Sequence, residues 1–560
     1  MAALTETEIQ RQKEIQQAEE LLFSGRQELG FAKGLFLGDF VADWAMPYPR
    51  LSDQQQADVD QALTELRRFL DEHLDSDWID RNADIPRHVI DGLGRVGVLG
   101  MTAPKEVGGR GFTQMQYCKV LEEIGARDAS TAVFTNAHHS IGIRALLLFG
   151  TPQQQHTWLP RLMNGEKRYI TNAAIAQVLT VMARTPIPGK DKDAITAFLV
   201  TPDMAGFEMI EPRMPKLGIR GTATGRFRLN NVRVPKENIL GPLGKGLRVA
   251  LTVLDFGRTT FGACCTGAAK TCLRMAVGHA NSRKQFNKTL GNFDLVKKKI
   301  ARMAADVYAM EAMTQVTASL IDRGLEDYMV ETAMLKVFTT ERLWDAVNDC
   351  FQIHGGSAYF DDSPLGRMLR DARINQIGEG SNEVLTSFIA LVGMRGPGME
   401  FKEIYDTMLK PSRGLSKAWD AGLKRLSAAV NVPDVPVRNA QLKGYATQLA
   451  RLVWRFNFAV DKALILYREP VMEMQLIQER IAIAAMELFA TTCTLSRWDS
   501  ELSAVGRNGS SATDFAAADL FVRRSLRKIR EALRDLGDND DRALLRTADA
   551  VLGTSTANAH

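Results

Sequence analysis

The chain has 560 residues, enough for two to four domains. Its residues are 45% hydrophobic and 24% charged, as in an ordinary globular protein. The sequence contains no uninterrupted run of about 18 apolar residues, the length that a membrane-spanning helix needs. The net charge of +4 is small, so composition does not favour a nucleic-acid partner.

Cysteine and histidine usage argues against a metal or disulfide framework. No Cys-x-x-Cys pair occurs and the chain has only eight histidines. We therefore expect the protein to occupy a reducing compartment. We also expect all six cysteines to be buried, reduced thiols: Cys118, Cys264, Cys265, Cys272, Cys350 and Cys493.

The first residues are acidic and Gln-rich and resemble neither a signal peptide nor a transit peptide. We expect a cytoplasmic protein, peripheral to the inner membrane if it meets one. A processed eukaryotic chain in the mitochondrial matrix would look the same.

In chain order, the pattern begins with a polar amphipathic helix over 5–30 and an arm over 31–50. The arm holds Phe31, Leu35, Phe36, Phe40 and Trp44, and we expect it to pack across another surface. Helical patterns then extend from Ser52 to about Leu162, interrupted by a Gly-rich loop over 108–111.

A short β-rich region follows these helices. Residues 194–200 and 225–232 are rich in β-formers and predict strands, and 164–184 predicts two more. Residues 245–395 return to long helical patterns. The order predicts a mostly α, α+β fold, and no Gly-x-Gly-x-x-Gly opens a βα unit to favour a Rossmann dinucleotide site.

A different region is expected after Gly396-Pro397-Gly398. We predict further helices over 438–468, 471–498 and 513–536, with Pro470 ending the first. The predicted organisation begins with an N-terminal helix and arm (1–51), an N-terminal helical domain (52–163) and a middle β-domain (164–244). A helical bundle (245–395), a linker (396–437) and a C-terminal helical domain (438–560) follow.

One carboxylate, Glu379, lies between two glycines, in a loop that follows one helical pattern and precedes another. Glycines let the backbone bend and a ligand approach, and Ser381 suits the start of the second helix. A carboxylate on such a loop can project into a cavity as a base. The alternative is a surface turn with a solvated Glu.

Seven short segments in chain order make the chain similar to the acyl-CoA dehydrogenase family, and the long C-terminal region resembles its very-long-chain branch. The resemblance is dense from about residue 85 to 395. The segments are 103–111 (APKEVGGRG), 164–172 (NGEKRYITN), 216–222 (KLGIRGT), 231–235 (NVRVP), 282–286 (SRKQF), 352–356 (QIHGG) and the Glu379 loop.

The resemblance implies dehydrogenation of an acyl-CoA between its α and β carbons, as in fatty acid β-oxidation, with FAD as cofactor. Glu379 then removes the α-proton while a hydride leaves the β-carbon for flavin N5. Asp255 and Arg258, one helical turn apart, occupy the family position that meets the CoA thioester arm. Gly380 would let the substrate pass close to the base. The alternative for Asp255 and Arg258 is an intrahelical ion pair.

The resemblance also assigns cofactor-binding positions. Arg283 and Phe286 match the family's Arg-x-x-Phe pattern, and a guanidinium fork suits a pyrophosphate. Gln352, Gly355 and Gly356 match the segment that reaches the flavin's ADP half from a neighbouring subunit. The remaining positions implied are Tyr169, Ile170, Thr171, Ser381 and Glu383.

His138-His139 is the one adjacent histidine pair. Adjacent residues on a helix do not converge on one ion, and no other ligands accompany them. We assign them to packing or to the acyl channel.

One departure from the family stands out. After Met163 the family continues with strands that line the flavin, carrying Leu-Thr-Glu-Pro and Gly-Ser-Asp. This chain passes from Met163 directly to Asn164, so several tens of residues are missing. Either the loss is real, which leaves unpaired strand edges and weakens FAD binding, or the sequence is truncated relative to the true protein.

Residues 411–430 place Leu415, Trp419, Leu423 and Leu426 at helical spacing, with a basic side of Arg413, Lys417, Lys424 and Arg425. This pattern suits a helix on an anionic membrane surface, the alternative being an ordinary packed helix. A second basic cluster, Arg523, Arg524, Arg527, Lys528 and Arg530, is expected to be a solvated helix face.

The expected partners are an acyl-CoA, an electron-transfer flavoprotein and a second copy of the chain in a homodimer. Two other functions remain open. One is a non-catalytic scaffold or assembly protein, favoured by the missing strands. The other is a flavin monooxygenase on the same fold, against which Glu379 argues.

Overall fold

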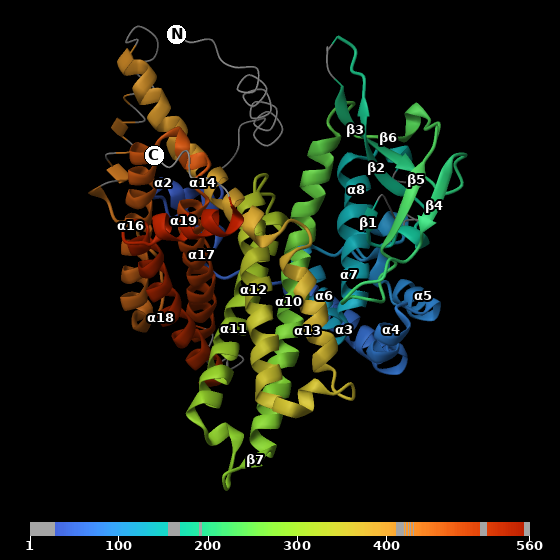
Figure 1. Cartoon of the computed structure of the whole chain (residues 1–560), viewed down its shortest axis with the longest axis horizontal. Helices are drawn as coiled ribbons and strands as arrows, with labels where there is room; N and C mark the ends of the chain where they lie inside the picture. The colour runs from blue at the N-terminus through green and yellow to red at the C-terminus, as the bar shows by residue number, and fades with distance from the viewer. Residues whose placement is uncertain are drawn as a thin grey trace. The chain divides into compact units, whose positions relative to one another are not determined.

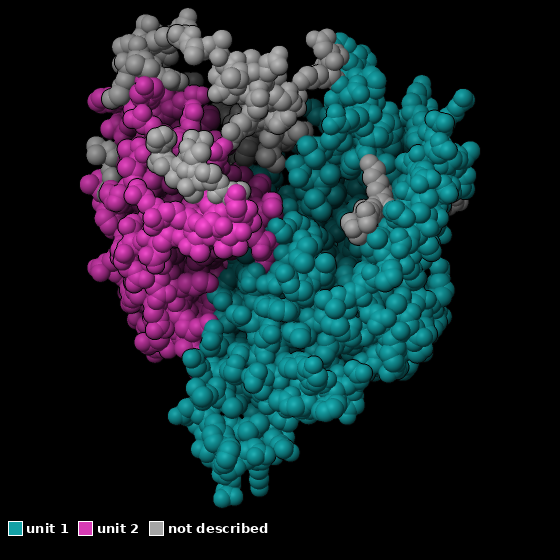
Figure 2. Space-filling model, in the orientation of Figure 1, with its two compact units in different colours: residues 1–28, 49–381 teal, residues 29–48, 382–560 magenta. Residues whose placement is uncertain are grey.

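The computed structural model describes residues 29–154, 168–189, 193–409, 431–503 and 512–553, together with Trp419, Gly422, Leu423, Arg425, Ser427, Ala428 and Val430. The chain divides into two compact units, coloured separately in Figure 2. Unit 1 contains 49–381 and unit 2 contains 29–48 with 382–553, as far as these residues are described. The predicted helix over 5–30 lies almost wholly outside the described residues.

Unit 1 begins with a helical layer. Capping boxes at Ser52 and Thr113 start two of its helices, because each hydroxyl accepts a backbone N–H three residues on. Their apolar faces form one core with Leu66, Val89 and Leu121 at its centre. The helices are α3 (Asp53–His73), α4 (Ser76–Asn82), α5 (Arg87–Arg95), α6 (Gln114–Arg127), α7 (Ala129–Ala137) and α8 (Arg144–Phe149), with a π-helical turn at His138–Ile143.

Two small antiparallel sheets follow, in strand orders β1-β5-β4 and β2-β3-β6. An apolar core with Leu179, Val200 and Phe227 fills the β-domain, and a second cluster joins Leu199 to α8 and to the start of α10. In these orders β1 and β4 form the edges of the first sheet and β2 and β6 those of the second. The strands are β1 (Arg168–Ile170), β2 (Leu179–Thr185), β3 (Ala194–Val200), β4 (Phe207–Glu211), β5 (Gly225–Leu229) and β6 (Ile239–Leu240).

The helix α10 (Gly246–Ser282) extends through unit 1 from the β-domain to the β7–β8 hairpin (Figure 1). It packs tightly because glycines remove side chains at the contacts. A Cβ on Gly262 would lie 2.8 Å from the Leu335 side chain, and one on Gly267 only 2.0 Å from the Glu122 carbonyl oxygen. The remaining elements of unit 1 are β7 (Lys284–Gln285), β8 (Lys288–Thr289), α11 (Asp294–Asp322), α12 (Met329–His354) and α13 (Leu365–Arg373).

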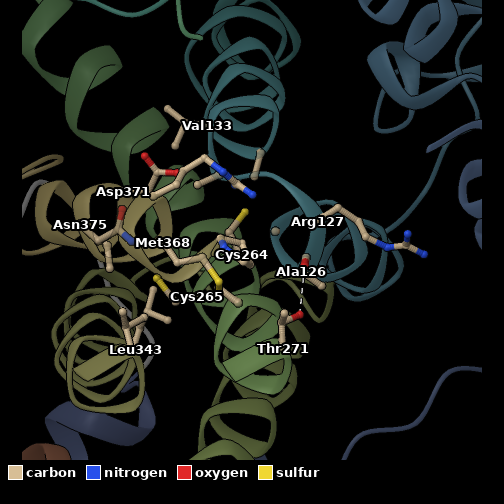
Figure 3. Close-up of a pocket in the computed structure, with 18 of the residues that line it drawn as sticks. Ala126, Arg127, Val133, Cys264, Cys265, Thr271, Leu343, Met368, Asp371 and Asn375 are labelled. Atoms are coloured by element: carbon tan, nitrogen blue, oxygen red, sulfur yellow. Dashed lines mark hydrogen bonds between the residues drawn. The ribbon is translucent and has the colours of Figure 1, made fainter. Parts of the chain in front are cut away.

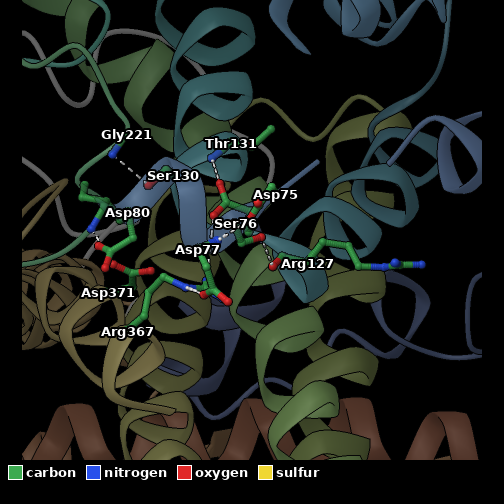
Figure 4. Close-up of polar contacts among 12 residues, drawn as sticks. Asp75, Ser76, Asp77, Asp80, Arg127, Ser130, Thr131, Gly221, Arg367 and Asp371 are labelled. Carbon is green, nitrogen blue, oxygen red and sulfur yellow. Dashed lines mark hydrogen bonds and ion pairs between the residues drawn. The ribbon is translucent and has the colours of Figure 1, made fainter. Parts of the chain in front are cut away.

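A loop of the β-domain, 217–222, is held by the surrounding helices (Figure 4). The Ile219 N–H donates to the buried Asp371 carboxylate on α13 at 2.5 Å, and the Gly221 N–H donates to the Ser130 hydroxyl on α7 at 3.2 Å. Ile219 has φ +43°, an unfavourable value for a β-branched residue. These bonds fix the β-domain against the helices that form the candidate site.

Unit 2 is helical, and the arm belongs to it. The ring of Phe31 in α2 (Phe31–Leu37) packs on Phe489 at 5.6 Å, and that of Phe36 on Phe456 at 5.0 Å. The Ser496 hydroxyl donates to the Ala45 carbonyl at 2.6 Å. The other helices are α14 (Asn382–Leu409), α16 (Lys443–Tyr467), α17 (Gln475–Ser503), α18 (Ala512–Asp535) and α19 (Asp541–Leu552).

The mostly helical α+β fold is confirmed, and so are strands at 194–200 and 225–229. No break in the helix marks the predicted boundary at Gly396-Pro397-Gly398, because α14 continues through Pro397, and the boundary stays a prediction. Its glycines serve packing instead: a Cβ on Gly393 would lie 2.2 Å from the Phe36 ring. The sequence reading also missed β4, β6, the β7–β8 hairpin and α19, which are short or polar.

Part of the predicted membrane-surface segment has another role. Arg425 is buried and pairs with Glu400 at 2.6 Å and Asp461 at 2.8 Å, so it does not belong to an exposed basic side. Its other basic residues, Arg413, Lys417 and Lys424, lie outside the described residues. The second cluster is a surface of α18, as predicted, although Lys528 pairs with the buried Glu487. Among the residues described, no helix is long and apolar enough to cross a membrane.

Replacing Gly267 by Ala should destabilise unit 1, because the new methyl group would collide with the backbone of α6. We expect Gly267→Ala to lower the free energy of unfolding by about 1–3 kcal/mol. Gly278, also in α10, has nothing within 4 Å of its Cβ position. Gly278→Ala should therefore be neutral or raise stability by up to about 1 kcal/mol. Thermal unfolding of both variants checks this; equal midpoints would contradict it.

Candidate active site

Glu379 lies in a strained loop between α13 and α14. A 3₁₀ turn at Ile374–Gln376 follows α13, and the Ile374 carbonyl accepts from Ile377 and Gly378 at 2.9 and 2.8 Å. Glu379 and Gly380 then have φ values of +57° and +93°. A glutamate in the left-handed region is uncommon, and such strain tends to persist where the surrounding structure fixes it, often at functional sites.

The carboxylate points into the protein. A Cβ on Gly257 would lie 3.1 and 3.3 Å from its two oxygens, so this glycine makes room for the carboxylate beside α10. The Asn136 amide of α7 donates to Oε1 at a long 3.5 Å. Although Glu379 as a residue is partly exposed, Oε2 is buried and has no hydrogen-bond partner within the described structure.

Burial raises the pKa of Glu379 to about 7, against the opposing charges of Arg258 and Lys336. The alternative of a solvated turn is therefore wrong. A carboxylate with this pKa can take or release a proton near neutral pH, which is what a general base needs.

Two neighbours of this carboxylate were missed by the sequence reading. The buried Lys336 of α12 donates through Nζ to the Gly380 carbonyl at 2.8 Å. Asn136 is also buried, and its Oδ1 accepts from the Thr260 hydroxyl. The signal for Lys336 was its position as a single charge within the apolar run 333–338.

Asp255 and Arg258 share one face of α10, as their spacing predicted, and pair at 2.7 Å. Both are buried, and the Thr332 hydroxyl also donates to Asp255. Burial raises the pKa of Asp255 to about 6, with Arg258 and Thr332 opposing. The ion-pair alternative is therefore correct, and contact with a CoA arm stays a prediction. Arg258 Nε is buried without a partner in the described structure.

A cavity of about 370 Å³ lies between α7, α10, α12 and α13 (Figure 3). Val133 and Phe261, each about one helical turn from the Glu379 neighbours Asn136 and Gly257, line it. The sulfur atoms of Cys264 and Cys265 border its middle. The cavity therefore lies about one helical turn from these neighbours, and Glu379 is not among the residues that line it. Its α13 side is more polar, with Arg367, Asp371 and Asn375.

The Arg-x-x-Phe and Gln-x-x-Gly-Gly segments meet at the far end of α10. The His279 ring of α10 stacks on His354 of α12 at 4.3 Å, and Arg283 directly follows α10. Gly355 has φ +61°, and nothing lies within 4 Å of a Cβ on Gly355 or Gly356. An open glycine backbone beside an exposed guanidinium fits a pyrophosphate. Gln352 lies one turn before these glycines.

The structure does not bring these segments to Glu379. Gly257, beside the carboxylate, and Arg283 are separated by roughly 40 Å along α10, at 1.5 Å per residue. This is more than one FAD molecule spans. Phe286, at the hairpin turn, is 86% exposed, and the centre of its ring lies 6.3 Å from that of Phe293.

The other predicted cofactor positions are less fully defined. Tyr169 and Ile170 lie in β1 and Thr171 follows it, but the side chains of the strand lie outside the described residues. Ser381 is the last residue of unit 1, directly before α14, and Glu383 is exposed in the first turn of that helix. Their roles stay predictions, and the Met163–Asn164 junction lies outside the described residues.

The His138-His139 pair is used for packing. His138 Nε2 contacts the Leu99 carbonyl at 2.8 Å and His139 Nε2 contacts the Val98 carbonyl at 2.7 Å. Burial lowers the pKa of His138 to about 4, which keeps the ring neutral. None of the six cysteines, all of which are described, forms a disulfide, and all but Cys264 are buried, as predicted.

Comparisons with known proteins agree with this architecture. Four domain families match in order: "Acyl-CoA dehydrogenase, N-terminal domain" at 56–166, "middle domain" at 153–232, "C-terminal domain" at 244–393, and "ACAD9/ACADV, C-terminal domain" at 440–556. The chain is 30% identical to the mitochondrial very long-chain specific acyl-CoA dehydrogenase of Homo sapiens, over 84% of this chain and 79% of that protein.

Two further similarities cover more of the chain. A probable acyl-CoA dehydrogenase of Mycobacterium tuberculosis is 30% identical over 96% of this chain and 90% of its own length. A solved acyl-CoA dehydrogenase of Bacillus anthracis, described as complexed with FAD, shares the fold at a TM-score of 0.72 and 24% identity, covering 94% of this chain and 96% of that one.

The alignment to the mycobacterial protein also bears on the missing segment. It extends over 601 positions, more than the 560 residues of this chain. Several tens of positions in that alignment therefore lie opposite gaps in this chain, the size of the loss predicted after Met163.

The two carboxylates near loop 217–222 should affect stability with opposite pH dependence. Burial raises the pKa of Asp371 to about 7, whereas Arg370 holds that of Asp80 below its ordinary value. Folded Asp371 keeps a proton that the unfolded chain releases at lower pH, so its contribution falls as pH rises from about 4 to about 7. Asp371→Asn should raise the thermal midpoint at pH 8 and change it little at pH 4.5.

Asp80→Asn is the matched control for this comparison. The ionised Asp80 stabilises the folded state above its unfolded pKa, and that contribution is lost only on acidification. The substitution should lower the midpoint at pH 8. Thermal scans of both variants across pH would contradict the assignment if Asp371→Asn were as destabilising as Asp80→Asn at pH 8.

Proposed function

Because the chain belongs to the acyl-CoA dehydrogenase family, we propose that it dehydrogenates long or very long acyl-CoA thioesters to trans-2-enoyl-CoA, with Glu379 as the α-proton base. The observation that carries the assignment of the base is the buried, unpartnered Oε2 of Glu379, held on a strained loop. The family is one of oxidoreductases acting on acyl-CoA, and the identity of the base and the chain length are our proposals.

The environment of Glu379 suits the removal of a weakly acidic proton. A thioester α-proton is hard to remove, so the base must act in a water-excluded site with a raised pKa. Gly257 and Asn136 place the carboxylate, and Oε2 is the oxygen without a partner in the described structure. Above pH about 7 the carboxylate is ionised and ready to accept the proton.

We propose FAD as the cofactor. The open backbone of Gly355 and Gly356 and the guanidinium of Arg283 would hold its pyrophosphate, and the exposed Phe286 would cover part of it. Bound FAD supplies the acceptor for the hydride from the β-carbon. Since these residues lie roughly 40 Å along α10 from the Glu379 region, we propose that they serve the flavin of a second copy in a homodimer.

The cavity supports an acyl chain as the other part of the substrate. It lies beside α7 and α10, about one helical turn from Asn136 and Gly257, and Ala132, Val133, Phe261 and Ala268 give it apolar walls. We propose that the acyl chain occupies it and that Asp255 and Arg258 meet the CoA arm. An electron-transfer flavoprotein is the proposed acceptor of the electrons.

A second candidate function is a non-catalytic scaffold or assembly protein. The positions without a counterpart in the alignment to the mycobacterial relative favour it, because strands that line the flavin in the family would be among them. The same experiment distinguishes the two candidates. Purified protein that carries no flavin, and does not bleach with palmitoyl-CoA after FAD is added, would favour the scaffold.

Glu379→Gln should abolish turnover while leaving substrate binding intact. The amide keeps the shape of the side chain but cannot accept the proton, so anaerobic flavin bleaching by palmitoyl-CoA should slow by at least about 10³-fold. Acyl-CoA affinity, measured by calorimetry, should change little. Glu237→Gln, at an exposed carboxylate, is the control and should bleach like the parent. Retained bleaching in Glu379→Gln would refute the base.

We also propose a cytoplasmic or matrix protein that contacts a membrane peripherally through 411–430. Trp419 and Leu423, one helical turn apart, are 70% and 49% exposed. The double variant Trp419→Glu, Leu423→Glu should lose most binding to anionic phosphatidylglycerol vesicles in a sedimentation assay, because charged groups resist insertion. Phe458→Glu, at another exposed aromatic side chain, is the control. Equal soluble fractions of the parent with and without vesicles would end the membrane proposal.

A further inference from the structure

A charged amino group lies within the core of unit 1 at Lys336. The residue is completely buried on α12, between apolar neighbours such as Leu335 and Val337. A buried ammonium group is costly unless it is hydrogen-bonded or lies near opposite charge. Lys336 has both, since Nζ donates to the Gly380 carbonyl at 2.8 Å and the Glu379 carboxylate acts on its charge.

The bond reaches the most strained part of the loop. Glu379 and Gly380 are consecutive residues with positive φ, and Lys336 binds the carbonyl of the second. Backbone strain of this kind persists only where surrounding contacts over-determine it. On the other side, Gly257 leaves space for the carboxylate, so α10 and α12 together define the position of the loop.

We propose that Lys336 is a positioning residue for the base: its bond to the Gly380 carbonyl holds the Glu379 loop, and its positive charge favours the carboxylate over the carboxylic acid. This inference rests on the proposed function of Glu379. It gives α12 a role in the chemistry, whereas the proposed substrate-contacting positions lie on α10 and in the Glu379 loop.

The charges around the pair support this role. Arg258 on α10 and Lys336 on α12 both lower the pKa of Glu379, against burial. Burial lowers the pKa of Lys336 to about 8, and the positive charge of Arg258 acts in the same direction. Cys265 and Glu379 raise this pKa, and Glu341 on the same helix raises it weakly. Burial raises the pKa of Cys265 to about 12 and raises that of Cys264 well above its ordinary value, so both thiols stay neutral. From α7 the uncharged Asn136 amide faces the carboxylate.

These values define a narrow pH window. Glu379 is ionised above pH about 7 and Lys336 is charged below pH about 8, so the charged pair is most populated between them. Removing the positive charge should raise the pKa of Glu379. Removing the hydrogen bond as well should lower the rate even where the carboxylate is ionised.

Two substitutions separate charge from hydrogen bonding. Lys336→Met keeps a similar length without charge or donor, and Lys336→Gln keeps a donor without charge. Lys270→Met is the control, because Lys270 is also largely buried but pairs with Glu122 and Glu311, away from the loop. The measurements on the full-length protein are the pH titration of the Glu379 carboxyl infrared band, identified by its loss in Glu379→Gln, and the bleaching rate with palmitoyl-CoA.

In both Lys336 variants the titration midpoint of Glu379 should rise by roughly one pH unit, the effect of withdrawing a nearby opposite charge. At high pH, Lys336→Met should bleach about tenfold more slowly than Lys336→Gln, the factor for one hydrogen bond of about 1.4 kcal/mol. Lys270→Met should alter thermal stability but neither the midpoint nor the rate. An unchanged midpoint in both Lys336 variants overturns the inference, and so does a rate equal to the parent in Lys336→Met.

The infrared band keeps this test separate from the proposed function. If the parent does not bleach but the midpoint still shifts, dehydrogenation by this chain fails and the electrostatic role of Lys336 stands. If the parent bleaches and the midpoint does not shift, the role of Lys336 fails by itself.

Discussion

The removal of one carboxylate from water is the constraint around which unit 1 is arranged. Glu379 keeps a pKa near neutral because its oxygens face a glycine, an amide and two cationic groups at some remove, and not solvent. These neighbours come from three helices, α7, α10 and α12. The loop that carries Glu379 is strained, so its geometry depends on α7, α10 and α12 being packed at fixed spacing.

That spacing comes from small residues on α10. Gly257 leaves room for the carboxylate, Gly262 for Leu335 of α12, and Gly267 for the backbone of α6. One helix therefore sets how closely the Glu379 carboxylate, α12 and α6 approach it. The same helix ends at Arg283, so it also separates the carboxylate from the residues suited to a pyrophosphate.

Unit 2 shows a different use of small residues. The N-terminal arm contributes Phe31 and Phe36 to a core formed mainly by the last third of the chain. Gly393 of α14 accommodates the Phe36 ring, which explains glycines in a helix that sequence rules would end there. The residues at the start of the described chain are therefore needed to complete this helical unit.

The sequence by itself determined the order of helices and strands, the buried thiols, the one-turn spacing of Asp255 and Arg258 and the candidate base, because these depend on local periodicity and on short motifs. It did not determine the burial of Glu379, the roles of Lys336 and Asn136, or the place of the arm. Lys336 is 44 residues from the carbonyl it binds, and Phe36 is several hundred residues from Phe456. Only the tertiary structure decided these contacts, since desolvation and packing arise between segments that are distant in sequence and carry no local pattern.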